Sequence, residues 1–175
     1  WADSLKATYS YNAQGYILQY LEEVWSASAW VNMYREVYTY ESSKVTIKIN
    51  NWNAVGSAWE NDILITYYID ALGYLTAEQH EYWNTSLNMY ETGYYDLYDE
   101  DGYNTEHFEK TWSDSLNKFT EGIRVLNTYD SNEPKDIKQA IVQVWDPAVS
   151  GWKNLQKTVY FWAGSVSVEP VNLSS

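Results

Sequence analysis

The chain has 175 residues, a formal net charge of −13 and no cysteine. This length suits one domain, and the acidity argues against nucleic-acid binding, because a phosphate backbone needs a basic face. Without cysteine there are no disulfides or thiolate metal sites, and no apolar run approaches the roughly 18 residues of a membrane-spanning helix. The 10 Trp and 18 Tyr, against 3 Phe, indicate rings that lie half exposed with one polar edge in water.

The first predicted strand leads to a tight turn after Tyr11. Asn12 can open a type I turn, and Gly15 can take the left-handed position after it, which is the usual three-residue hairpin loop. A second strand then runs to Trp25, ten residues after the glycine. The segment WSASAW joins Trp25 to Trp30 through small residues that favour a turn. We therefore expect the two rings to face each other across the mouth of a hairpin.

The same unit recurs about every 30 residues, with its first tryptophan at Trp25, Trp52, Trp83, Trp112 and Trp145. A second ring follows five or seven residues later at Trp30, Trp59, Phe119 and Trp152. In the third unit this place falls near Asn88 and Met89. The glycine turn returns as Asp70 with Gly73 and as Asp99 with Gly102. Periods of this length indicate a repeat architecture, so we predict a structural role for these turn residues.

The alternative for the segment YILQYLEEVW is a helix, but its equivalents VTIKINNW and IKQAIVQVW are β-branched and alternate. We therefore predict an all-β fold of about eleven antiparallel strands in sequential order, each of roughly ten residues. Residues 1–162 would form about five hairpin units, and residues 163–175 a linker. Because neither side of the strands is cleanly apolar, we expect an extended or curled twisted sheet with cross-strand ladders. A closed barrel and a propeller stay open as alternatives.

The histidines and carboxylates favour neither a metal site nor an active site. His80 and His107 lie at different distances from their turn glycines, and no third His or Cys completes a zinc site. An EF-hand frame around Gly102 would put Leu97 and Phe108 where calcium requires carboxylates. The acidic residues there are better explained as a hairpin turn: Asp96, Asp99, Glu100 and Asp101. We predict no enzyme activity, no cofactor and no metal.

Exposed indole rings can stack on the faces of sugars. The candidates for such binding are Trp30, Trp59, Trp83, Trp112 and Trp152. Their periodicity favours a role as structural staples, because binding residues need not recur in every unit. A carbohydrate-binding module is therefore the alternative to a structural repeat.

The segments YSYNAQGYI and YYIDALGYLT, with WSASAWVN and WNAVGSAWEN between them, resemble the YTYDxxGNLT repeats of secreted or surface proteins from the Bacteroidetes. The resemblance covers residues 1 to about 162, and is more distant to YD repeats, whose usual arginine is missing. It implies an extracellular or outer-surface spacer, stalk or adhesin segment that is a cargo of type IX secretion, with secretion machinery, other surface proteins or glycans as partners. It implies no activity. The O-glycosylation pattern of these bacteria matches DSL at Ser4 and Ser115.

Overall fold

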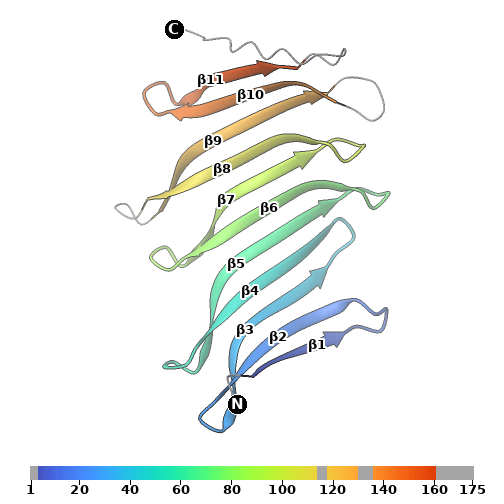
Figure 1. Ribbon diagram of the computed structural model, residues 1–175, viewed down its shortest axis with the longest axis vertical. Helices are drawn as coiled ribbons and strands as arrows, with labels where there is room; N and C mark the ends of the chain where they lie inside the picture. Colours follow the sequence, from blue (N-terminus) through green and yellow to red (C-terminus); the bar gives the residue numbers. More distant parts are fainter. Residues whose placement is uncertain (1–3, 114–117, 130–135, 161–175) are drawn as a thin grey trace.

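The computed structural model describes residues 4–113, 118–129 and 136–160, which form one antiparallel sheet of eleven strands. Each strand pairs with the next one along the chain, and the sheet is open (Figure 1). This confirms the sequential meander and excludes the closed barrel and the propeller. The strands are β1 (Leu5–Tyr11), β2 (Ile17–Ser26), β3 (Ala29–Tyr40), β4 (Lys44–Asn53), β5 (Ala58–Ile69), β6 (Leu75–Asn84), β7 (Met89–Tyr98), β8 (Asn104–Ser113), β9 (Lys118–Tyr129), β10 (Ile137–Asp146) and β11 (Gly151–Val159).

The sheet is a single layer with both faces open to solvent. Among the hydrophobic side chains that the structure describes, Ile49 and Phe108 are the buried ones, with 9% and 6% of their surface exposed. A domain normally buries one face of a sheet against a second layer. Here the stabilising contacts are instead the backbone ladder and the side-chain pairs between neighbouring strands.

The glycine turns lie at one end of the strands, on the right in Figure 1. In the first of them the amide of Gly15 donates to the carbonyl of Asn12 at 3.0 Å. The Asn12 side-chain oxygen accepts from the amides of Gln14 and Tyr16. Asp70 and Asp99 make the same contacts in their turns. The positive φ angles of Gly15, Gly73 and Gly102, 87°, 91° and 83°, explain why glycine stands at this position.

At the opposite end of the strands lie the hairpins that carry the ring pairs. Each of these hairpins contains a β-bulge, where the second strand has an extra residue. The skipped residues include Met33, Gly93 and Leu155. A bulge interrupts the alternation of side chains, so the two halves of a strand follow different parities. This is why the sequence alternation along a whole strand shows little contrast between the faces.

The third unit differs from the sequence-based expectation at its second ring. Trp83 pairs with Tyr90, and not with Asn88 or Met89. The two ring centroids lie 4.9 Å apart. The spacing of seven residues equals that of Trp52 and Trp59, so a phenol simply replaces the second indole.

Candidate functional site

Among the side chains that the structure describes, four ring pairs mark one face of the sheet, which we call the tryptophan face. The pairs are Trp25–Trp30, Trp52–Trp59, Trp83–Tyr90 and Trp145–Trp152. Their centroids are 4.9–5.6 Å apart and their planes meet at 69–78°. This edge-to-face arrangement is a favourable one for aromatic pairs, and it places the rings across the mouth of each hairpin as expected.

In three of these hairpins, a lysine or arginine from the preceding strand lies over the second ring of the pair. The guanidinium of Arg35 lies 4.5 Å from the ring centroid of Trp59, and its Nε donates to Oδ1 of Asn50 at 3.1 Å. Asn50 is 1% exposed. Its Nδ2 donates to the Glu60 carbonyl at 3.3 Å and to Oδ1 of Asn61 at 3.1 Å. Three strands are thereby tied together by one buried amide.

The same device recurs in the last unit. Arg124 lies 4.7 Å from the Trp152 centroid and donates to Oε1 of Gln143 at 2.6 and 2.8 Å. Gln143 in turn donates to Asn154 at 2.7 Å. In the first unit the cation is Lys6, which pairs with Glu23 at 2.5 Å and lies 5.7 Å from the Trp30 centroid.

The third unit has lost this cation. Leu64 takes the place of Arg35 and stands opposite Glu81 in the register. Burial raises the pKa of Glu81, because desolvation disfavours the charged carboxylate. The hydroxyl of Tyr90 on the same face is buried and makes no hydrogen bond within the described residues.

The other face of the sheet is acidic, and we call it the carboxylate face. Register and alternation place on it eight acidic residues of β2–β8: Glu22, Glu36, Glu60, Asp62, Glu78, Glu91, Asp96 and Glu109. Hydrogen bonds along and across strands agree, for example Tyr34 to Glu36 at 2.7 Å and Asn51 to Asp62 at 2.8 Å. The lysines and arginines of β2–β9 whose side chains are described all lie on the tryptophan face: Arg35, Lys44, Lys48, Lys110 and Arg124.

Both histidines lie within one cluster on the carboxylate face. His80 is 2.6 Å from Glu78, and its ring stacks on Tyr94 with centroids 4.2 Å apart. His107 is 2.9 Å from Asp96 and 6.0 Å, centroid to centroid, from the other side of Tyr94. Sequence reasoning missed this, because it compared distances from the turn glycines and not cross-strand neighbours. No group of three metal-ligating residues is found within 4–113, 118–129 and 136–160.

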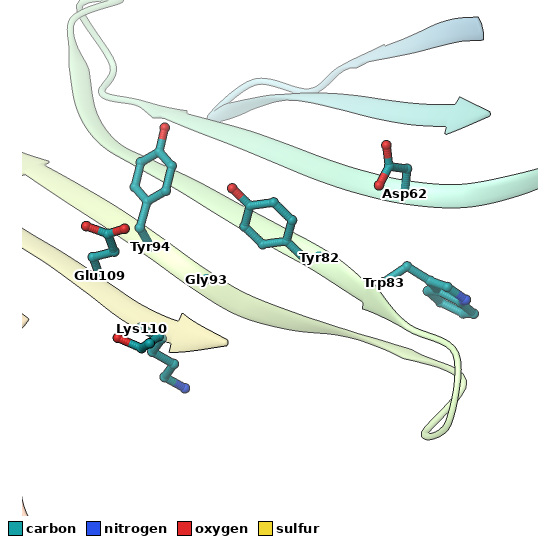
Figure 2. Close-up of a pocket in the computed structure, with 8 residues that line it drawn as sticks. Asp62, Tyr82, Trp83, Gly93, Tyr94, Glu109 and Lys110 are labelled. Atoms are coloured by element: carbon teal, nitrogen blue, oxygen red, sulfur yellow. The ribbon is translucent and has the colours of Figure 1, made fainter. Parts of the chain in front are cut away.

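A cavity of about 570 Å³ opens on this part of the sheet (Figure 2). Asp62, Tyr82, Tyr94 and Glu109 rise from one side of the strands, while Lys110 extends from the other (Figure 2). The buried Gly93 lies between them in β7. No sequence motif marked this group, since its members come from β5, β6, β7 and β8.

The cavity lies beside the bulge at Gly93, a residue of β7 that has no partner in the β6–β7 register. The β7–β8 ladder begins at the pair Tyr94↔Glu109. Between this pair and the hairpin that carries Trp83 and Tyr90, Gly93 contributes no side chain to the gap beside Lys110. The floor is therefore backbone that a ligand can approach.

Neither a protein-family model nor a curated protein matches the chain. Three solved structures similar to it come from Bacteroides species. A protein of unknown function from Bacteroides fragilis has a TM-score of 0.40 at 10% identity, over 90% of this chain and 93% of that one. A DUF3836 family protein from Bacteroides vulgatus has 0.40 at 17%, over 50% and 89%. A porin-like protein from Bacteroides uniformis has 0.22 at 10%, over 96% and 91%. These values carry no argument about function.

The rings singled out for sugar stacking are mostly engaged by other side chains. Trp30 is 39% exposed and packs on Trp25. Arginines cover Trp59 and Trp152, as described above, and Trp83 lines the cavity. The side chain of Trp112 lies outside the described residues. Sugar stacking on these rings stays a prediction.

The remaining predictions concern modification and membranes. Ser4 is exposed, and Ser115 lies outside the described residues, as does the predicted linker 163–175. In the part of the chain that the structure describes, no helix has the length and apolarity to cross a membrane.

Raising the pH above about 10 is expected to destabilise the fold. The hydrogen bond to Glu22 and burial raise the pKa of Tyr20 to about 12, and burial with the hydrogen bond to Glu106 raises that of Tyr95 to about 12. Unfolded tyrosine ionises near 10. The stability that these hydroxyls contribute is therefore present below about pH 10 and lost as the pH rises toward about 12. Urea midpoints across this range measure the loss.

Tyrosinate absorbance of the folded protein provides the control. Glu106→Gln should lower the ionisation midpoint of Tyr95 and leave that of Tyr20 unchanged. Ionisation of all tyrosines together near pH 10, with the fold intact, would contradict the prediction.

Proposed function

We propose that this chain is a non-enzymatic structural repeat module, an extracellular or cell-surface spacer, stalk or adhesin segment. The observation that carries the proposal is the open sheet in which strands follow one another in sequence order. In such an array each unit contacts essentially its neighbours, so units can be added or removed without changing the others. Length is then the property that the architecture controls.

The repeated staples support this function. A cation contacts the ring pair of the first, second and fifth hairpins; it is held by the side-chain amides of Asn50 and Gln143 in the second and fifth, and by the carboxylate of Glu23 in the first. These contacts stiffen a sheet that has no second layer. Export by type IX secretion and an outer-surface location belong to the same proposal and rest on the sequence resemblance. Sugar stacking gains no support from the described rings, whose edge-to-face pairs serve to close hairpins.

Deleting one complete unit is expected to give a shorter folded module. Removing residues 35–63 joins Tyr34 to Leu64 and takes out 29 residues. The fused strand keeps the 12-residue length of β3 and β5, and both halves keep their faces. The sheet should lose two strands, which shortens it by roughly 10 Å. Small-angle X-ray scattering measures the change in maximum dimension, and circular dichroism the retention of strand structure.

The matched control deletes residues 35–62, one residue fewer. This shift of one residue reverses the faces of everything after the junction, so the variant should lose cooperative unfolding. A properly phased deletion that fails to fold, or that folds without shortening, would refute the spacer proposal.

A further inference from the structure

We propose that a hollow at the glycine-turn end of the strands binds one sugar unit of a glycan, namely a pyranose ring with equatorial hydroxyls as in β-linked glucose. The hollow has a volume of about 420 Å³ and lies between the β5–β6 and β7–β8 turns, which are on the right in Figure 1. Its lining includes Tyr74, Tyr98, Glu100, Gly102 and Tyr103. This site is separate from the tryptophan rings discussed above and goes beyond the spacer function, so either proposal can fail without the other.

Two other units of the sheet close this position with a pair of tyrosine rings. Tyr16, which follows the glycine of the first turn, stacks on Tyr40 at the end of β3, with ring centroids 5.2 Å apart. Tyr103 and Tyr129 pack at the same place of the β8–β9 unit, with centroids 5.1 Å apart. In both pairs the hydroxyl of the second tyrosine donates to a backbone carbonyl of the facing strand, at 2.9 and 2.6 Å. In these two units the tyrosine after the turn glycine is therefore covered by a second ring.

The unit of β6 and β7 lacks the second ring because its register is different. In the two units above, the register continued past its last pair sets the two tyrosines opposite each other. The register of β6 and β7 ends at the pair Ala77↔Leu97. Its continuation sets Tyr74 opposite Glu100, which lies two residues beyond Tyr98. Tyr74 is 58% exposed, and no ring contact joins it to Tyr98 within the described residues. Tyr74 therefore lines the hollow with no second ring upon it.

The open ring and the carboxylate beside it match the two sides of such a sugar. A pyranose with equatorial hydroxyls presents apolar C–H faces, which can cover Tyr74 as a second tyrosine does in the other units. Its rim of hydroxyls needs hydrogen-bond partners, and Glu100 supplies a charge-assisted acceptor. Glu100 is exposed and makes no ion pair within the described residues, and no lysine or arginine is among the described lining. An aromatic side chain of a partner would cover the ring but leave the carboxylate unused.

The test titrates cellotetraose, an oligomer of β-linked glucose, into the whole chain and follows the backbone amide chemical shifts. We expect saturable shifts with a Kd on the order of 1 mM, because the hollow is open to solvent. The shifts should centre on Gly73 and Gly102, whose turns border the hollow, and should be absent at Gly15 of the first turn. This measurement uses the unsubstituted protein and is independent of any variant.

Variants then locate the sugar on the ring and the carboxylate. Tyr74→Ala should weaken binding about 5- to 10-fold, whereas Tyr74→Phe keeps the ring and should bind within about 2-fold of the unsubstituted protein. Glu100→Ala should weaken binding about 3-fold, because it removes one hydrogen-bond acceptor. The matched control is Tyr16→Ala, which removes a tyrosine already covered by Tyr40 and should change the affinity less than about 2-fold.

Four outcomes would overturn the proposal. Absence of saturation up to about 10 mM cellotetraose would show that the hollow does not bind such a sugar. Equal weakening by Tyr74→Ala and Tyr16→Ala would place the sugar elsewhere. Equal binding of sorbitol, which has hydroxyls but no pyranose ring, would exclude recognition of a sugar face. Binding of N-acetyltyrosine amide without binding of cellotetraose would assign the hollow to an aromatic side chain of a partner protein.

Discussion

Replacing Gly122 with alanine is expected to lower the free energy of unfolding by about 3 kcal/mol. A Cβ at this position would lie 1.9 Å from the carbonyl oxygen of Glu109 and 2.9 Å from the Cα of Lys110. Both atoms belong to the backbone of β8, so no side chain can rotate away. The strands β8 and β9 would have to separate at the bulge between Glu109 and Thr111. Denaturant unfolding followed by circular dichroism measures the loss.

Gly151→Ala is the matched control for this substitution. Its Cβ would meet the carbonyl oxygen of Val149 at 3.8 Å, which is ordinary contact. The exchange also lowers the entropy of the unfolded chain, so we expect a change between zero and a gain of about 1 kcal/mol. Similar losses for the two variants would show that the close approach of β9 to β8 does not determine the stability at Gly122.

The strand order was predictable because its signals are local. The residue pair Asn12 and Gly15, with its copies, specifies a turn through its own hydrogen bonds and a positive φ. The regular return of Trp25 and Trp30 fixes where the other hairpins close. Since both signals lie within a few residues of each turn, the sequence alone defines the strand number and the antiparallel order.

The composition of the faces was not predictable, because it depends on bulges. A skipped residue such as Met33 reverses the alternation within β3, so Arg35 shares a face with Trp30 although the two are an odd number of residues apart. Simple alternation therefore mixed the acidic and basic residues and hid the segregation of charge. The positions of His80 and His107 on either side of Tyr94 were also hidden, because they depend on cross-strand register.

The cavity was also beyond sequence reasoning. It lies beside Gly93, which the bulge in β7 leaves without a partner on β6. Its other walls come from neighbouring strands, as Asp62 and Glu109 show, so no local stretch of the sequence marks it.

Replacing Asn50 with leucine is expected to lower the free energy of unfolding by about 3 kcal/mol, because buried hydrogen-bonding groups are left unsatisfied. Leucine fills a similar volume but removes the acceptor for Arg35 and the donors to Glu60 and Asn61. Asn50 is 1% exposed, so water cannot replace these bonds without opening the sheet. Chemical denaturation of the variant measures the loss.

The last unit contains the same hydrogen-bonded device in an exposed setting, and this makes it the control. Asn154 accepts a hydrogen bond from Gln143 at 2.7 Å, but it is exposed. Water can therefore satisfy Gln143 when Asn154→Leu removes the acceptor, and the expected loss is below about 0.5 kcal/mol. Asn50 makes three of these bonds and Asn154 makes one, so a loss at Asn50 more than three times that at Asn154 would show that burial adds to the stabilising effect of the network. Equal losses would mean that buried and solvent-exposed hydrogen bonds contribute alike to stability. The middle of this single-layer sheet would then be no better protected from water than its last strand.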